Sequence, residues 1–208
     1  MSNIKIGVLG IQGDIEENIL SVAEALKNLN LQGTVESVRY SESIAELDGL
    51  ILPGGESTVI GNLLSIQGNI FQTIKKKISE GMPVLGTCAG LIMLSKRTYD
   101  KVVGETKQNL FGVLDVVIER NAFGRQHESF EVDLNIPILG KGLFRGIFIR
   151  SPIINNVGES VNILTKLNDK IVAVKQNNII GTSFHPELST DRRLHELFIK
   201  DSVEFSKN

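Results

Sequence analysis

Strand-like and helix-like segments alternate along the first half of this chain, and no other feature of the sequence limits the fold as strongly. The segment 15–29 has the apolar periodicity of a helix, which Asp14 is expected to cap. Because β-α-β-α order usually produces parallel strands with helices on both faces, it predicts an α/β fold. Strands are expected at 4–11, 34–40, 47–55 and 83–87, and helices at 15–29, at 57–80 with a break near Gly68, and at 89–97.

The pattern changes after about residue 105. Short β-rich pieces are separated by turn residues such as Asn168-Asp169 and Asn177-Asn178, which predicts antiparallel hairpins added to a mostly parallel sheet. The last segment, 191–205, has the pattern of an amphipathic helix. Since the sequence shows no repeat, linker or low-complexity tract, residues 1–208 are expected to form a single domain.

The composition argues against several classes of protein. A formal net charge of −2 gives no electrostatic reason to expect nucleic acid or an anionic membrane as partner. The first residues contain neither a signal peptide nor a membrane anchor. One cysteine cannot form an internal disulfide, and together with three scattered histidines it makes no convincing metal site. We therefore expect a cytoplasmic protein without a metal.

The only cysteine, Cys88, lies where a predicted strand meets a predicted helix. The pentapeptide Gly86-Thr87-Cys88-Ala89-Gly90 has the form of a nucleophile elbow, in which a strand turns sharply into a helix and strains the backbone of the nucleophile. Unpaired N–H groups at the start of a helix also favour a thiolate. A lone cysteine is more commonly a small buried hydrophobe, so the pentapeptide by itself leaves both interpretations open.

A catalytic thiol needs a base, and three histidines are available. His185 ends a predicted strand, and Pro186 favours an extended backbone there, so Glu187 points to the same side as the imidazole and can orient it. A strand-end His-x-Glu is by itself more often a surface feature, but its combination with the elbow favours a catalytic triad. His195 is expected at a solvated helix position, and His127 in a loop or at a strand edge.

A glycine pair, Gly54-Gly55, follows the third predicted strand. Because loops at the carboxyl ends of adjacent parallel strands meet at one edge, we expect this pair beside Cys88. The N–H groups of Gly55 and Ala89 would then form an oxyanion hole, although the pair alone also fits a plain turn and helix cap. The loop GVLGIQG lacks the spacing of a dinucleotide-binding fingerprint, which leaves nucleotide binding as a weak alternative.

The motifs PGGES, GTCAGL and SFHPE, in this order, resemble those of class I glutamine amidotransferases. Within that family, GVLGIQGDI, ERNAFGRQHESFE and FIRSP resemble the glutaminase subunits of pyridoxal 5′-phosphate synthase, and the similarity runs from residue 4 to about 187. The resemblance implies a flavodoxin-like three-layer α/β sandwich that hydrolyses L-glutamine to L-glutamate and ammonia. It also implies a hetero-oligomer, in which the ammonia passes to a separate synthase (lyase) subunit for vitamin B6 biosynthesis.

The same resemblance implies roles for individual residues. Cys88 would be the nucleophile, His185 the general base and acid, and Glu187 the orienting carboxylate. An arginine suits a substrate α-carboxylate because it binds bidentately, although a structural ion pair is an alternative for each arginine. Gln12 would belong to a partner-facing rim, and no cofactor is implied. The substrate site would be lined by Gly55, Glu56, Ser57, Arg120, Ile149 and Arg150.

Two alternatives and one departure from the family pattern remain. The glutaminase subunit of imidazole glycerol phosphate synthase shares the triad layout, but RNAFGRQ and FIRSP argue against it. A non-enzymatic scaffold of the same fold is disfavoured because all three triad residues are present. The segment around 105–110, which contains KQN, is longer than the family pattern and is expected to touch only a surface loop.

Overall fold

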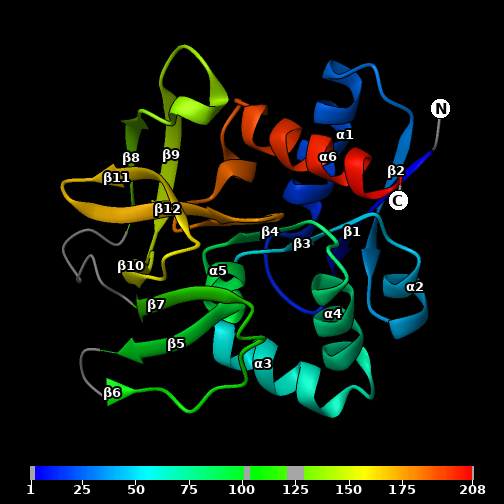
Figure 1. Cartoon of the computed structure of the whole chain (residues 1–208), viewed down its shortest axis with the longest axis horizontal. Coiled ribbons are helices and arrows are strands. Elements are labelled where there is room, and N and C mark those ends of the chain that lie inside the picture. Colours follow the sequence, from blue (N-terminus) through cyan, green and yellow to red (C-terminus); the bar gives the residue numbers. More distant parts are fainter. Residues whose placement is uncertain (1–2, 101–103, 121–128, 208) are drawn as a thin grey trace.

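The computed structural model of the chain describes residues 3–100, 104–120 and 129–207, and its centre is an eleven-stranded sheet (Figure 1). Part of this sheet is parallel, with the spatial order β2-β1-β3-β4-β13. A flavodoxin-like sheet has the same order, 2-1-3-4-5, so the expected α/β fold is confirmed. The parallel strands are β1 (Ile4–Leu9), β2 (Gly33–Val38), β3 (Gly49–Leu52), β4 (Val84–Thr87) and β13 (Ile179–Thr182).

Helices cover both faces of the parallel strands (Figure 1). Successive strand residues point to opposite faces, so Leu50 and Leu52 join one buried apolar cluster while Ile51 joins the other. The first cluster is covered by α2 (Ser41–Ala45), α3 (Ser57–Ile66), α4 (Ile70–Ser79) and α5 (Ala89–Leu94), and the second by α1 (Ile15–Asn28) and α6 (Arg193–Phe205). No helix of the described residues is both long and apolar enough to span a membrane.

The second half of the chain extends the sheet with hairpins, as predicted. Strand β12 pairs antiparallel with β13, and the order continues through β10, β7 and β5 to β6. A separate two-stranded sheet, β8-β9, lies beside this extension. The bounds are β5 (Ser95–Asp100), β6 (Gly104–Glu105), β7 (Leu114–Arg120), β8 (Ser129–Leu134), β9 (Phe144–Ile149), β10 (Ile153–Val157), β11 (Asn162–Leu167) and β12 (Lys170–Gln176), with short 3₁₀ turns η2 (Pro137–Leu139) and η3 (Pro186–Leu188).

The helix expected at 89–97 is shorter than predicted, since α5 ends at Leu94. The buried Ser95 hydroxyl donates to the Ile92 carbonyl at 2.7 Å, which satisfies one of the last helical acceptors. From Ser95 onward the backbone pairs in parallel with β7 instead. The periodicity of 89–97 did not reveal this, because strand pairing with a distant segment outweighs weak helical propensity.

Two other local expectations are also wrong. Asp14 occupies the N-cap position of α1, but its side chain makes no capping hydrogen bond to the described residues of the helix. His195 is fully buried in α6 rather than solvated. Buried neighbours of His195 in α6 include Leu194, Phe198 and Ile199. Amphipathic periodicity located the apolar face of α6 but did not show that this face is broad enough to include the histidine.

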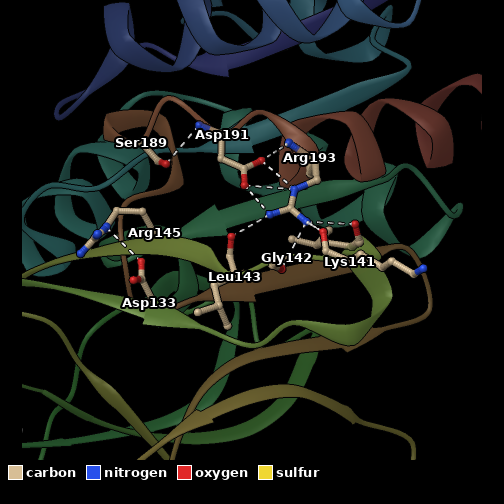
Figure 2. A network of polar contacts seen from close by, with 9 residues as sticks. Asp133, Lys141, Gly142, Leu143, Arg145, Ser189, Asp191 and Arg193 are labelled. Atoms are coloured by element: carbon tan, nitrogen blue, oxygen red, sulfur yellow. Dashed lines mark hydrogen bonds and ion pairs between the residues drawn. The ribbon is translucent and has the colours of Figure 1, made fainter.

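One arginine fastens the start of α6 to the turn before β9 (Figure 2). Arg193 Nη1 donates to the Lys141 carbonyl at 2.9 Å, and Nη2 donates to the Leu143 carbonyl at 3.0 Å. The same guanidinium pairs with the carboxylate of Asp191. These bonds hold the β8-β9 hairpin against α6, which matters because the residues at the end of β9 line the pocket described next.

Candidate active site

The carboxyl ends of β1, β3, β4 and β13 meet at one edge of the sheet, where they surround a pocket of about 380 Å³. Ligand sites of open α/β sheets form in this place because loops from opposite sides of the sheet diverge there. The loop after β3 and the turn at Cys88 thus lie side by side, as the strand order predicted. The pocket is lined by Gln12, Asp14, Gly55, Glu56, Ser57, Cys88, Ile92, Arg120, Ile149, Arg150, Pro152 and His185.

Cys88 has the strained backbone expected of an elbow, with φ 49° and ψ −100°. Positive φ is unfavourable for a residue with a Cβ, so the surrounding packing must hold it. A Cβ on Gly90 would lie 1.9 Å from the Leu52 carbonyl oxygen, which explains why glycine is needed where the elbow crosses β3. Ala89 begins α5 directly after Cys88, and the thiol faces the pocket.

His185 follows β13, and two carboxylates contact the Nδ1 atom of its ring. The Nδ1 atom is 2.7 Å from Glu187 Oε1 and 3.1 Å from Asp14 Oδ2. The His185 backbone N–H donates to the Ile147 carbonyl at 2.8 Å, which ties the backbone of His185 to β9. The predicted pairing of His185 with Glu187 is thus observed, whereas the contact with Asp14 was missed.

These contacts change the acid–base properties of the three groups. Burial disfavours a charged imidazole, but hydrogen bonds with Asp14, Cys88 and Glu187 outweigh burial and raise the pKa of His185 to about 12. The hydrogen bond from His185 lowers the pKa of Asp14. Burial raises the pKa of Glu187, whose side chain is wholly inaccessible to solvent. These contacts therefore make His185 a stronger base than a free imidazole.

The glycine pair lies beside this histidine. A Cβ on Gly54 would come within 2.4 Å of His185 Cε1, so no larger residue fits without a shift. Gly55 has φ 149°, a value that residues with a Cβ rarely adopt. The Gln12 side-chain oxygen accepts the Glu56 N–H at 2.9 Å and thereby joins the loop after β1 to the loop after β3. Gln12, which was expected at a partner-facing rim, also lines the pocket.

Arg120 reaches the pocket from the end of β7 but is already bound. Its Nη2 lies 3.0 Å from Glu56 Oε1, and its Nη1 donates to Thr58 Oγ1 at 3.0 Å. Burial opposes ionisation of Glu56, but backbone N–H groups of Thr58 and Val59 lower the pKa of Glu56. Glu56 thus caps α3 and pairs with Arg120 at once.

The segment around 105–110 lies at the surface with exposed and half-buried residues, but the expectation that it touches only a surface loop is wrong because Gln108 contacts α3 and Arg120. The Gln108 side-chain oxygen accepts from Ser57 Oγ and Thr58 Oγ1, each at 3.2 Å, and lies 3.5 Å from Arg120 Nη1. Gln108 therefore supports the side of α3 that faces the pocket. No local pattern in KQN indicates this, because the contact depends on how the chain between α5 and β7 folds back.

Ile149 and Arg150 contribute the opposite wall of the pocket. The Ile149 N–H donates to Ser151 Oγ at 3.1 Å, and Arg150 has a positive φ of 43°. Within the described part of the chain, no carboxylate lies within ion-pair distance of Arg150. This arginine is therefore the more available cation for a carboxylate ligand. His127 lies outside the described residues.

Three potential metal ligands approach one another, namely Asp14, His185 and Glu187, whose ligand atoms lie within 4.8 Å of one another. Both carboxylates stand at hydrogen-bond distance from the same ring nitrogen, which accounts for the cluster without an ion. Among the pocket residues, Asp14, Ile92 and Pro152 were not expected. The sequence could have indicated Asp14, because this residue follows the first strand at the sheet edge where the pocket forms.

A model of the SNO glutamine amidotransferase family matches residues 8–204. The chain belongs to the SNO glutamine amidotransferase family. Membership agrees with the resemblance to class I glutamine amidotransferases seen in PGGES, GTCAGL and SFHPE.

Curated members of the family include proteins named pyridoxal 5′-phosphate synthase subunit PdxT. The PdxT of Nitrosopumilus maritimus is 49% identical over 94% of this chain and 95% of its own length. The PdxT of Archaeoglobus fulgidus is 47% identical over 95% of this chain and 98% of its own. These values support the narrower resemblance as well as the family.

Solved structures agree with the fold. A crystal structure described as a glutamine amidotransferase superposes with a TM-score of 0.83, at 44% identity over 95% of this chain and 98% of that one. The structure of PurLQS from Thermotoga maritima superposes with a TM-score of 0.58 at 16% identity, over 99% of this chain and all of that one. The second likeness concerns the fold alone.

Proposed function

We propose that this chain is the glutaminase subunit of a pyridoxal 5′-phosphate synthase, hydrolysing L-glutamine and passing ammonia to a separate synthase subunit. The strained Cys88 beside a carboxylate-bound His185 carries the proposal, because a nucleophile, its base and an orienting acid converge on one pocket. Relatives named PdxT favour this reading over the imidazole glycerol phosphate synthase alternative and over a scaffold.

In the proposed reaction, His185 takes the Cys88 proton and the sulfur attacks the carboxamide carbon of glutamine. The N–H groups of Gly55 and Ala89 stabilise the oxyanion of the tetrahedral intermediate. Protonated His185 donates to the departing nitrogen, the C–N bond breaks and ammonia leaves. Water, deprotonated by His185, then hydrolyses the thioester to release glutamate and restore the thiol.

The substrate amino acid would be held by charges already present in the pocket. Arg150 is placed to bind the α-carboxylate, and Glu56 is placed to attract the α-ammonium group. Arg120 acts by holding Glu56, and Ser57 and Ile149 shape the wall next to it. We further propose that residues 1–208 act as one domain, with no cofactor of their own and in the cytoplasm, where a single free cysteine stays reduced.

The nucleophile and the orienting acid can be tested together by measuring glutamate release in the presence of the synthase subunit. Cys88→Ala and Cys88→Ser should lose glutaminase activity, and His185→Asn should be nearly as severe. Glu187→Gln should retain more turnover because it perturbs the imidazole without removing it. Ser79→Ala, on the exposed end of α4, is the control and should match the unmodified protein. Substantial glutamate release by Cys88→Ala would refute the proposed nucleophile.

A further inference from the structure

The Nδ1 side of His185 is contacted by two carboxylates that come from different parts of the fold. Glu187 belongs to η3, two residues after the histidine, whereas Asp14 belongs to the loop between β1 and α1. Glu187 Oε1 is the nearer acceptor at 2.7 Å, and Asp14 Oδ2 follows at 3.1 Å. A triad needs only one such acceptor, so the second calls for an explanation.

We propose that Asp14 is a positioning residue, a second carboxylate that keeps the His185 proton on Nδ1 and leaves Nε2 directed at Cys88. The proposal rests on the catalytic roles proposed above for Cys88 and His185. A neutral imidazole carries one N–H, and the hydrogen bond at one nitrogen decides which tautomer is present. Two acceptors at Nδ1 favour the tautomer whose Nε2 is free to accept the thiol proton.

The two carboxylates differ in solvent exposure and in the direction of their pKa shifts. Glu187 is inaccessible to solvent, its Oε2 has no hydrogen-bond partner among the described residues, and burial raises its pKa. Asp14 is 36% exposed to the pocket, and the hydrogen bond from His185 lowers its pKa. Asp14 therefore stays ionised more readily, while Glu187 fixes the plane of the ring from the buried side.

The carboxylate of Asp14 is available for His185 because it does not cap α1. The Asp14 carbonyl accepts the Asn18 side-chain amide at 2.7 Å, but the carboxylate makes no capping bond to the described part of α1. A Cβ on Gly54 would lie 2.6 Å from Asp14 Oδ2 and 2.4 Å from His185 Cε1. The glycine thus leaves the space in which carboxylate and imidazole meet.

Other charged groups share the pocket and would remain unchanged when Asp14 is altered. Cys88 hydrogen-bonds to the His185 ring, and Glu187 contacts its Nδ1 atom. The Glu56–Arg120 pair and Arg150 line the remaining walls. A change in pH dependence that follows substitution of Asp14 alone is therefore attributable to the Asp14–His185 contact.

The test compares Asp14→Asn and Asp14→Glu in the complex with the synthase subunit, with kcat/KM for glutaminase measured across pH. Removing a carboxylate destabilises the imidazolium, so Asp14→Asn should shift the alkaline limb of the profile to lower pH by about one unit or more. The value of kcat should fall by roughly tenfold, with a smaller change in KM. Asp14→Glu should restore much of both. Glu17→Gln, which removes an exposed charge from the first turn of α1, should leave the profile unchanged.

A spectroscopic measurement separates positioning from stability. The ¹⁵N shifts of the His185 ring should show more of the Nε2–H tautomer, or an earlier loss of the imidazolium, in Asp14→Asn than in Glu17→Gln. An Asp14→Asn protein with unaltered profile and ring shifts would overturn this inference, provided that Cys88→Ala is inactive. A lower melting temperature with neither change would overturn it as well, because Asp14 would then be structural only. Activity in Cys88→Ala would instead remove the proposed site on which the inference rests.

Discussion

His195 is a fully buried imidazole on α6, and neither of its ring nitrogens has a hydrogen-bond partner among the described residues. Burial, aided by the nearby Arg192 charge, lowers the pKa of His195 to about 3. The native protein thus keeps this side chain neutral over a range of pH in which the unfolded chain protonates it. Such a residue makes stability depend on pH without any catalytic role.

We predict that the free energy of unfolding decreases as pH falls through 6.5, the ordinary pKa of histidine, towards about 3. The unfolded state binds the extra proton in this window, so acid favours unfolding, and above 6.5 the effect is absent. Between pH 6.5 and 5.0 the loss should be roughly 2 kcal/mol. Urea unfolding of the protein and of His195→Leu should be measured at pH 7.5 and 5.0. The difference between the two pH dependences of the free energy of unfolding gives the contribution of His195. Equal pH dependence in the two proteins would contradict the prediction.

At the scale of elements, Arg193 determines how α6 meets the β8-β9 hairpin (Figure 2). Its guanidinium donates hydrogen bonds to backbone carbonyls of the turn before β9 and, at the same time, to the Asp191 carboxylate. A planar fork of donors can do this, whereas an ammonium group cannot reach the same acceptors in the same geometry. The contact is worth more than a surface ion pair because it satisfies backbone carbonyls.

We expect Arg193→Lys to lower the free energy of unfolding by about 1–3 kcal/mol, since several of these acceptors lose their donor. Arg145→Lys is the matched control, because Arg145 forms an exposed cross-strand pair with Asp133 at 3.1 Å in the same hairpin. Its cost should stay within about 1 kcal/mol. Urea midpoints of the two variants, recorded side by side, give the comparison. A control as damaging as Arg193→Lys would show that the network around Arg193 has no special importance.

The site as a whole is assembled from loops at one edge of the sheet, and two of these loops are coupled. Gln12 accepts the Glu56 N–H, and a Cβ on Gly13 would lie 1.6 Å from the Gly54 carbonyl oxygen. Movement of the loop after β1 must therefore be transmitted to the Gly54-Gly55 peptide. Because glycine tolerates both signs of φ, that peptide can turn its N–H toward or away from an oxyanion.

We accordingly predict that the isolated chain is a poor glutaminase and that docking of the synthase subunit near Gln12 raises its turnover. Loss of one oxyanion donor costs about 100- to 1,000-fold in rate, which sets the size of the expected activation. Steady-state glutamate production should be compared for the purified chain with and without the synthase subunit, with Cys88→Ala as blank in both. Equal turnover in the two samples would exclude the switch and leave the triad unaffected.

Much of the molecule could be predicted from the sequence where the signals are local. Alternating apolar runs predicted the parallel strands, because strand and helix periodicities are properties of neighbouring residues. Gly86 and Gly90 around Cys88 indicated the strained turn, and the two-residue spacing of His185 and Glu187 indicated their pairing. These features need no knowledge of distant segments.

Contacts between distant segments were decided only by the tertiary structure. Asp14 reaches His185 across most of the chain, Gln108 reaches Arg120 and α3, and His195 is buried between elements that periodicity treats separately. In each case the local sequence suggested a cap, a surface loop or a solvated helix position. The outcome differed because burial and hydrogen bonding depend on which elements pack together, and that packing is settled by the core as a whole.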